Sequence, residues 1–464
     1  MNLYDHLQSY RKQGKTPFHM PGHKRNASFF MENPYAWDVT EIDGTDNLHH
    51  PQGILRREME RLCKHYGTKD SYLLVNGSTC GIMAAIASCC RRGERILVAR
   101  NCHRSVYHAI FLLELEPVYL YPREDLQTGI LLDVPTAQVA ETLEQEDVSC
   151  VVLTSPTYEG IVSDIRAIAE LCHERNIPLI VDEAHGAHFA WSRQFPQTAM
   201  EQGADLVIES LHKTLPSLTQ TALLHRVTER ISGNILMKYL AMFETSSPSY
   251  VLMASISQCI SWLEEQGEPV WTTFEKRLSQ LEKQAAKWQH LQLWRKQGQD
   301  SSKLVIGTWG TNLTGVQLAE RLRKEYGIEV EMETPQYILA MTSVADIDES
   351  FQYLSKALAQ IDVTLNNKDE KNVTERERAS VTKVRVRMNP YQAFYYPQKT
   401  VRMEESLGLI SSEYAFIYPP GIPFLAPGEE ITEEVLAEIR KAKKYGLDLL
   451  GLEDKEGNWI RVCQ

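Results

Sequence analysis

The stretch Glu209-Ser210-Leu211-His212-Lys213-Thr214 directly follows the apolar segment 204–208, whose composition predicts a buried strand. A lysine at the end of such a strand is uncommon, because removing an ammonium group from water is unfavourable. The hexapeptide alone allows two interpretations. Lys213 extends its amine to solvent, or it is an activated lysine that forms a Schiff base with pyridoxal phosphate (PLP), with the neighbouring hydroxyl and imidazole groups near the phosphate.

Short apolar segments alternate with helical patterns on both sides of this stretch. The expected strands lie at 71–75, 95–99, 150–153, 177–181, 204–208 and 221–224. This alternation predicts an α/β fold with a mostly parallel central sheet that helices cover on both faces. Ligands of such sheets bind at the carboxyl ends of the strands, so the residues that follow each strand are candidates for a site.

Five parts are expected along the chain. Residues 1–53, with several prolines and glycines, form an irregular N-terminal arm, and residues 54–295 form a large domain. Residues 296–365 form a small αβ domain. The polar and charged stretch 366–380 is expected to be a linker, and 381–464 a C-terminal domain.

Composition argues against several classes of protein. The net charge of −12 disfavours nucleic acid, which binds to basic surfaces, and suits a small cationic substrate. The nine cysteines lack the spacing of a disulfide framework or a zinc site, so no metal is expected. No apolar run is long enough to cross a membrane, and the N-terminus does not resemble a signal peptide. A cytoplasmic location without membrane partners is therefore expected.

Two other strand ends carry groups that suit a phosphorylated aromatic ligand. Gly77, Ser78 and Thr79 follow the strand at 71–75, at the start of a helix, where backbone N–H groups can bind an anion. An ordinary helix cap is the simpler interpretation of these residues alone. His103 follows the strand at 95–99 and can lie against a planar ring, although a single histidine is more often structural.

Asp182 follows the strand at 177–181 and begins the sequence Asp-Glu-Ala-His. A carboxylate at this position is what the protonated nitrogen of a pyridine ring requires. The same four residues occur in a class of helicases, but those proteins also need a phosphate loop of the form GxxxxGK followed by Ser or Thr. The sequence contains no such loop, so the helicase interpretation is rejected.

Ser155 and Thr157 follow the strand at 150–153, and their hydroxyl groups are expected near the ring oxygen or the phosphate of the ligand. The strand ends thus supply a phosphate cradle, a stacking ring, an acid for the pyridine nitrogen and the lysine. Each feature is weak alone. Together they fit a single site and predict a fold-type I PLP enzyme.

The chain resembles the bacterial Orn/Lys/Arg decarboxylase family of PLP enzymes over nearly its whole length. The resemblance rests on PFHMPGHK at 17–24, DVTE at 38–41, LHHP at 48–51, VNGST at 75–79, RNCH at 100–103, VDEAHG at 181–186, SLHKTLP at 210–216 and PPGIP at 419–423. It implies that Lys213 binds PLP covalently, that Asp182 binds the pyridine nitrogen and that His103 stacks on the ring. The residues implied near the phosphate or elsewhere on the cofactor are Ser78, Thr79, Ser210, His212 and His185.

The resemblance further implies decarboxylation of a basic amino acid to its amine, most simply arginine to agmatine. Lysine and ornithine are alternative substrates. Either Lys213 or His212 would assist proton transfer. An aminotransferase or an aldolase would use the same lysine and aspartate, and a non-catalytic regulatory relative is a further alternative.

A cationic substrate requires acidic partners, and Glu41, Asp43 and Glu429 are the candidates, although acidic residues are mostly exposed. The longer members of the family begin with a receiver-like wing domain that supports ring-shaped assembly. This chain resembles the short form, so a homodimer or a dimer of dimers is expected.

Overall fold

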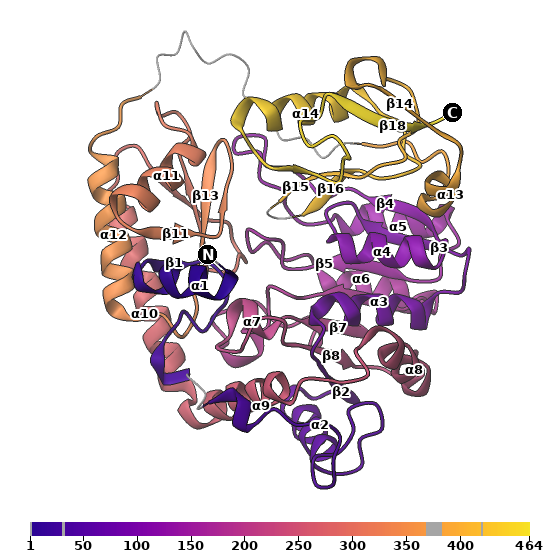
Figure 1. Cartoon of the computed structure of the whole chain (residues 1–464), viewed down its shortest axis with the longest axis horizontal. Helices are drawn as coiled ribbons and strands as arrows, with labels where there is room; N and C mark the ends of the chain where they lie inside the picture. The colour runs from indigo at the N-terminus through magenta and orange to yellow at the C-terminus, as the bar shows by residue number, and fades with distance from the viewer. Residues whose placement is uncertain (1, 30–32, 368–382, 419–420) are drawn as a thin grey trace.

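A seven-stranded sheet lies at the centre of the computed structural model, which describes residues 2–29, 33–367, 383–418 and 421–464. The strand order is β2-β8-β7-β6-β5-β3-β4 (Figure 1). β8 is antiparallel to both of its neighbours, and the other pairs of this sheet are parallel. The strands are β2 (Asp70–Leu74), β3 (Arg95–Ala99), β4 (Glu116–Leu120), β5 (Val151–Thr154), β6 (Leu179–Asp182), β7 (Leu206–Glu209) and β8 (Ala222–Arg226). The predicted α/β fold with a mostly parallel sheet is confirmed.

Helices cover both faces of this sheet because its strand residues are apolar on both sides. Ile96 and Val98 pack with one set of helices, and Leu97 packs with the set on the opposite face. The first set is α3 (Gly77–Cys89), α4 (Arg104–Leu112) and α8 (Gly233–Phe243). The second set is α2 (Ile54–Tyr66), α5 (Thr136–Gln145), α6 (Ile165–Glu174), α9 (Tyr250–Gln266) and α10 (Glu268–Ala285). The sheet is therefore a closely packed frame for the residues at its strand ends.

The small domain lies beside the central sheet and is coloured orange in Figure 1. Its four-stranded antiparallel sheet has the order β12-β13-β10-β9. Its elements are β9 (Gln292–Trp294), β10 (Lys303–Gly307), α11 (Gly315–Glu325), β11 (Ile328–Val330), β12 (Met332–Glu333), β13 (Tyr337–Met341) and α12 (Asp348–Asp362). β9 lies before residue 296, the predicted start of this domain.

The N-terminal arm contains regular structure, although an irregular segment was expected. α1 (Leu3–Lys12) begins at Asn2, whose Oδ1 accepts a hydrogen bond from the N–H of Asp5 at 2.8 Å. β1 (Thr16–Phe18) pairs in parallel with β11 of the small domain, and Phe18 is fully buried. Because β1 gains its hydrogen bonds from a strand far along the chain, no local pattern indicates it.

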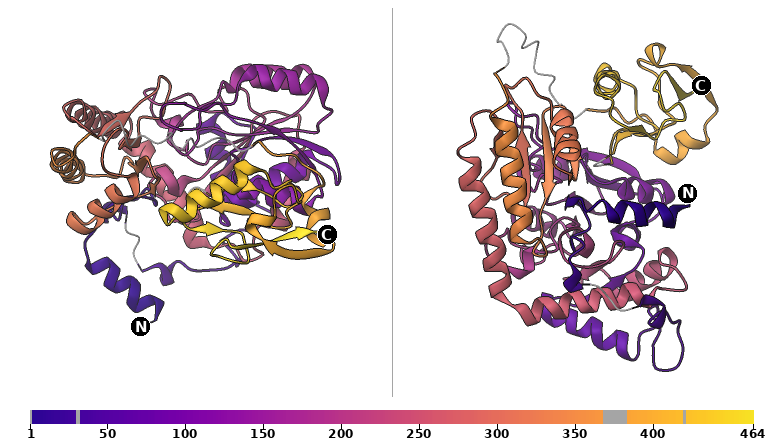
Figure 2. Two further views of the ribbon diagram at one scale, coloured as in Figure 1. Left: turned by 90° about the horizontal axis from the view of Figure 1, so that it is seen from above. Right: turned by 60° about the vertical axis from the view of Figure 1, so that its left-hand side comes forward.

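The C-terminal domain, yellow in Figure 1, lies against the part of the large domain that contains β3, β4 and α4 (Figures 1 and 2). Its elements are α13 (Pro390–Tyr395), β14 (Gln398–Arg402), β15 (Ala415–Ile417), β16 (Ile422–Leu425), α14 (Glu433–Tyr445), β17 (Leu449–Leu450) and β18 (Trp459–Cys463). β14 pairs with β18, and β15 lies between β16 and β17. Residues 368–380 of the predicted linker, and residues 419 and 420 of the PPGIP motif, lie outside the described residues.

A buried ion pair joins the large and C-terminal domains. Arg100, which follows β3, donates from Nη2 to Oε2 of Glu429 at 3.0 Å and from Nη1 to the carbonyl oxygen of Pro423 at 2.6 Å. The same carboxylate oxygen accepts the N–H of Ala426 at 2.7 Å. The side chains of Arg100 and Glu429 are only 3% and 1% exposed. Burial raises the pKa of Glu429, and Arg100 opposes that shift.

Candidate active site

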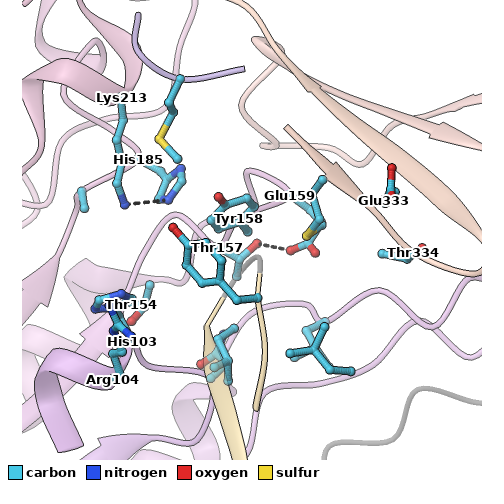
Figure 3. A pocket seen from close by; sticks show the side chains of 18 of the residues that line it. His103, Arg104, Thr154, Thr157, Tyr158, Glu159, His185, Lys213, Glu333 and Thr334 are labelled. Atoms are coloured by element: carbon cyan, nitrogen blue, oxygen red, sulfur yellow. Dashed lines mark hydrogen bonds between the residues drawn. The ribbon is translucent and has the colours of Figure 1, made fainter. Parts of the chain in front are cut away.

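A cavity of about 460 Å³ lies where the carboxyl ends of β3, β5, β6 and β7 meet (Figure 3). This volume is in the range of small-molecule and cofactor sites. The predicted site residues that line it are Gly77, Ser78, Thr79, His103, Thr157, Asp182, His185, His212 and Lys213. Residues from the N-terminal arm, the small domain and the C-terminal domain complete the walls: Met20, Met332, Glu333, Tyr337, Ile417, Tyr418, Glu438 and Lys441.

Lys213 lies in α7 (Leu211–Thr214), a single helical turn that follows β7. Its Nζ is 3.0 Å from Nε2 of His185, and the two side chains point toward each other in Figure 3. Burial lowers the pKa of Lys213, and Asp182 opposes that shift. A lysine with a lowered pKa retains more of the free amine, which is the nucleophilic form. This environment suits the predicted covalent anchor.

Asp182 is the last residue of β6, and its carboxylate lines the cavity. Its Oδ1 accepts the N–H of Ala184 at 3.1 Å. Burial raises the pKa of Asp182, whereas Lys213 and this hydrogen bond lower it. A buried carboxylate with one backbone donor has spare lone pairs for a further donor, as the nitrogen of a pyridine ring would provide.

His103 and His212, two of the three histidines that line the cavity, are neutral near pH 7. Burial, assisted by Lys213, lowers the pKa of His103 to about 3. Burial also lowers the pKa of His212 to about 4, although a hydrogen bond to Thr221 opposes this. His212 Nδ1 lies 2.9 Å from the carbonyl oxygen of Thr221, so Nδ1 carries the proton and donates it. Nε2 of neutral His212 therefore has only a lone pair.

The start of α3 has the geometry of an anion site. Gly77 has a φ of +75°, and Asn76 makes no side-chain capping bond to the helix, so the first N–H groups lack that partner. Among the described residues, the buried hydroxyl groups of Ser210 and Thr214 have no hydrogen-bond partner. Buried polar groups without partners are rare in proteins and suggest a missing ligand. The residues present therefore fit the phosphate, the ring nitrogen and the aldehyde of PLP.

Gly22 of the PFHMPGHK motif holds the arm against the segment that carries Lys213. Its N–H donates to the carbonyl oxygen of His212 at 2.7 Å, and its carbonyl oxygen accepts the hydroxyl of Ser343 from the small domain. A Cβ at position 22 would lie 2.6 Å from the carbonyl oxygen of Leu215. Only glycine permits this approach of two backbones.

We expect Gly22→Ala to weaken both the fold and the retention of PLP, because the added methyl group displaces the Lys213 segment. The loss of unfolding free energy should be about 1–3 kcal/mol, as for overpacking elsewhere. Urea unfolding and dialysis of the PLP-loaded protein measure the two effects. Gly14→Ala is the control for PLP retention alone, since a Cβ there meets no atom within 4 Å, while its φ of +64° makes alanine unfavourable for stability. It should retain PLP like the wild type, and an equal loss of PLP from both variants would contradict the argument.

Some predicted residues are not brought to the cavity wall. Ser155 is buried behind it, and its Oγ accepts the N–H of Ser163 at 3.1 Å. Ser210 is fully buried under the Lys213 turn. Glu41 and Asp43 are exposed on the N-terminal arm. Glu429 is engaged with Arg100 at the domain junction.

Sequence reasoning missed several charged residues at the site, among them Glu159 and Lys303. Glu159 lines the cavity, and its carboxylate accepts hydrogen bonds from Tyr337 at 2.8 Å and from Thr157 at 3.2 Å. The sequence could have indicated Glu159, because it follows the buried strand β5 by only a few residues and strand ends form the site. Lys303 lies behind His185 and comes from the first residue of β10. No local pattern distinguishes it from other lysines at strand starts.

The described residues lack two further kinds of feature. They contain no group of three or more histidine, cysteine, aspartate or glutamate side chains arranged to hold a metal ion. None of the helices within these residues combines the length and the hydropathy of a membrane span.

The fold and the site define a class of protein, the fold-type I enzymes that use PLP. Residues 1–309 match the family model described as Orn/Lys/Arg decarboxylase, major domain, and residues 373–453 match the Orn/Lys/Arg decarboxylase C-terminal domain. The chain therefore belongs to the Orn/Lys/Arg decarboxylase family, which consists of PLP-dependent amino-acid decarboxylases. This membership removes the aminotransferase, aldolase and non-catalytic alternatives.

Individual relatives agree with the family assignment. An arginine decarboxylase of Halalkalibacterium halodurans is 33% identical over 481 residues, which cover 100% of this chain and 97% of the relative. An arginine decarboxylase of Bacillus subtilis is 31% identical over 480 residues, with the same coverage. The crystal structure of the Francisella novicida lysine decarboxylase LdcF is similar in fold, with a TM-score of 0.77 and 20% identity over 97% of this chain and 78% of that one.

Proposed function

We propose that this enzyme converts arginine to agmatine and carbon dioxide, with PLP bound through Lys213. The proposal is supported by the arginine decarboxylases that align with the whole chain at 31–33% identity. The observation that carries the site assignment is the position of Lys213 beside Asp182 and His185 at the carboxyl edge of the sheet. Lysine and ornithine are the alternative substrates.

The cavity residues would bind and orient the cofactor. Bound PLP supplies an electron sink for the electron pair that remains on Cα when the carboxylate leaves. Asp182 would accept a hydrogen bond from the ring nitrogen, and neutral His103 would pack against the ring without repelling its positive charge. Ser78, Thr79 and the N–H groups that begin α3 would bind the phosphate.

Lys213 is a better candidate than His212 for donating the proton that replaces the carboxylate on Cα. An ammonium group at Nζ carries protons to give, whereas neutral His212 has its single proton committed to the carbonyl oxygen of Thr221. Nε2 of His212 can accept a hydrogen bond but has no proton to donate. His212 therefore serves to position neighbouring groups, and Lys213 delivers the proton.

Glu159 is the carboxylate that we assign to the guanidinium group of the substrate. Its oxygens are fixed by Tyr337 and Thr157, and each retains a lone pair for a further donor. In Figure 3 it lies across the cavity from Lys213, where the far end of an extended side chain belongs. Burial raises the pKa of Glu159, while the bond from Tyr337 lowers it. A bound cation favours the ionised form further.

The Glu159→Gln variant should raise KM for arginine by about tenfold to a hundredfold, the energy of one or two charge-assisted hydrogen bonds. Its kcat should change much less, because the reacting carbon lies at the other end of the substrate. Glu333→Gln is the matched control, since Glu333 lines the same cavity but is also within 3.4 Å of Arg323 outside it. Steady-state kinetics that show equal KM values for both variants would argue against this assignment.

Assembly and location complete the proposal. We infer a homodimer or a dimer of dimers and a cytoplasmic location. Analytical ultracentrifugation tests the assembly, and a monomer at all concentrations would contradict it.

The decisive experiment supplies PLP with arginine, lysine or ornithine in turn and identifies the amine that forms. Agmatine should be the main product, with stoichiometric carbon dioxide and no keto-acid acceptor. Cadaverine or putrescine as the main product would replace arginine with the corresponding alternative. The absence of carbon dioxide with all three substrates would remove the proposed function.

A further inference from the structure

His185 lies between two lysines that come from different domains. Its Nε2 is 3.0 Å from Nζ of Lys213, and its Nδ1 is 3.5 Å from Nζ of Lys303. Lys303 begins β10 of the small domain and is 0% exposed, so it cannot meet substrate or solvent directly. The roles proposed above leave this buried lysine unused.

The chemistry of an imidazole limits the protonation of the two lysines. Burial, together with both lysines, lowers the pKa of His185 well below its ordinary value, so the ring is neutral. A neutral imidazole has one N–H donor and one lone pair, whereas an ammonium group can only donate. Two ammonium groups therefore cannot both bond to His185. One of the lysines has to be an uncharged amine that accepts the N–H of the ring.

The surrounding charges decide which lysine keeps its proton. Burial alone would raise the pKa of Asp300, but His188 and Lys303 bring it down to about 2, so a firm negative charge faces Lys303. Asp182, the carboxylate that faces Lys213, has its pKa raised by burial. Other charged or titratable groups around the two lysines and His185 are Glu331, Lys24, His103, His212 and Tyr158, whose ring packs against His185. Glu331 raises the pKa of both lysines.

We propose that Lys303 is a positioning residue that acts through His185 to keep Lys213 uncharged before PLP is bound. As an ammonium group, Lys303 donates to Nδ1 of His185 and thereby fixes the ring proton on Nε2. Nε2–H then donates to Nζ of Lys213, which accepts this bond only as a free amine. The free amine keeps the lone pair with which a lysine attacks a carbonyl carbon. This inference rests on the proposed role of Lys213 and is independent of which amino acid is the substrate.

Competitive labelling with acetic anhydride tests the protonation state of Lys213 in the full chain after removal of PLP. Only the free amine reacts, so the rate of acetylation against pH, measured by peptide mass spectrometry, gives the midpoint for Lys213. In Lys303→Met, His185 can take its proton on Nδ1 and accept from a charged Lys213. The midpoint should therefore rise by about one pH unit, the usual effect of a lost charge or hydrogen bond. Lys303→Gln, which still donates to Nδ1 without a charge, should shift it clearly less.

A double-variant comparison separates action through the ring from a direct effect of charge. In a His185→Phe background, Lys303→Met should add little further shift. An unchanged midpoint in Lys303→Met would overturn the inference, as would equal shifts for the Met and Gln variants or a full shift in the His185→Phe background. Circular dichroism confirms that each variant is folded. The labelling uses no PLP and no substrate. A result that overturns this inference would therefore leave the proposed decarboxylation of arginine untouched.

Discussion

Lys213→Ala should release carbon dioxide from arginine at least about a thousandfold more slowly than the wild type, because it loses both the covalent anchor for PLP and the proton donor. It should also lose the visible absorbance of covalently bound PLP, and borohydride reduction should no longer attach the cofactor to the chain. Radiometric assays of carbon dioxide and the mass of the reduced protein measure the two effects. The fold should persist, because Lys213 lines the cavity and its truncation only enlarges that cavity.

Lys296→Ala provides a matched control, because Lys296 is an exposed lysine outside the cavity. It should keep the absorbance and the turnover of the wild type. Full activity in Lys213→Ala, or attachment of PLP to another lysine, would remove Lys213 from its assigned role.

Arg100→Met should lower the free energy of unfolding by about 3–5 kcal/mol, the effect of leaving one member of a buried ion pair without its partner. The variant leaves Glu429 buried without Arg100, and it removes the donor to Pro423 across the domain junction. Urea unfolding measures the loss, and hydrogen exchange should rise in β16 of the C-terminal domain. Arg123→Met is the control, since the exposed pair of Arg123 with Asp133 should contribute at most about 1 kcal/mol.

The defect of Arg100→Met should depend on pH in a definite direction. Burial raises the folded-state pKa of Glu429 above its unfolded value, and the loss of Arg100 raises it further. The folded variant therefore binds more protons than the unfolded one, and its stability falls as pH rises from the unfolded pKa toward the folded pKa. The variant should be relatively more stable near about pH 5 than near about pH 8. Arg100→Met with Glu429→Gln should recover part of the loss and lose this pH dependence.

The sequence predicts those parts of the fold that local patterns determine. Six of the seven strands of the central sheet lie within about two residues of their predicted positions, since buried parallel strands are short apolar runs between helices. The edge strand β4 was not predicted. α1 and β1 were missed for different reasons. The cap of α1 at Asn2 is a local signal that the irregular composition of the arm obscured, whereas β1 exists because it pairs with β11.

The same distinction applies to the site. Lys213, Asp182 and His103 were predictable because each follows a strand of one sheet, and the sheet brings strand ends together. The same reasoning could have predicted Glu159, which follows β5, but only the hydroxyl groups of Ser155 and Thr157 were considered in that loop. Lys303 was not accessible, because its position behind His185 depends on how the small domain packs against the large one.

The walls of the cavity span the chain from Met20 to Leu447, and this has a consequence for biosynthesis. Asp182 and Lys213 are added to the growing chain before half of the protein has been made. Ile417, Tyr418 and Lys441 of the C-terminal domain are among the last residues to be added. The nascent enzyme thus displays its reactive lysine long before translation has supplied the residues that enclose it.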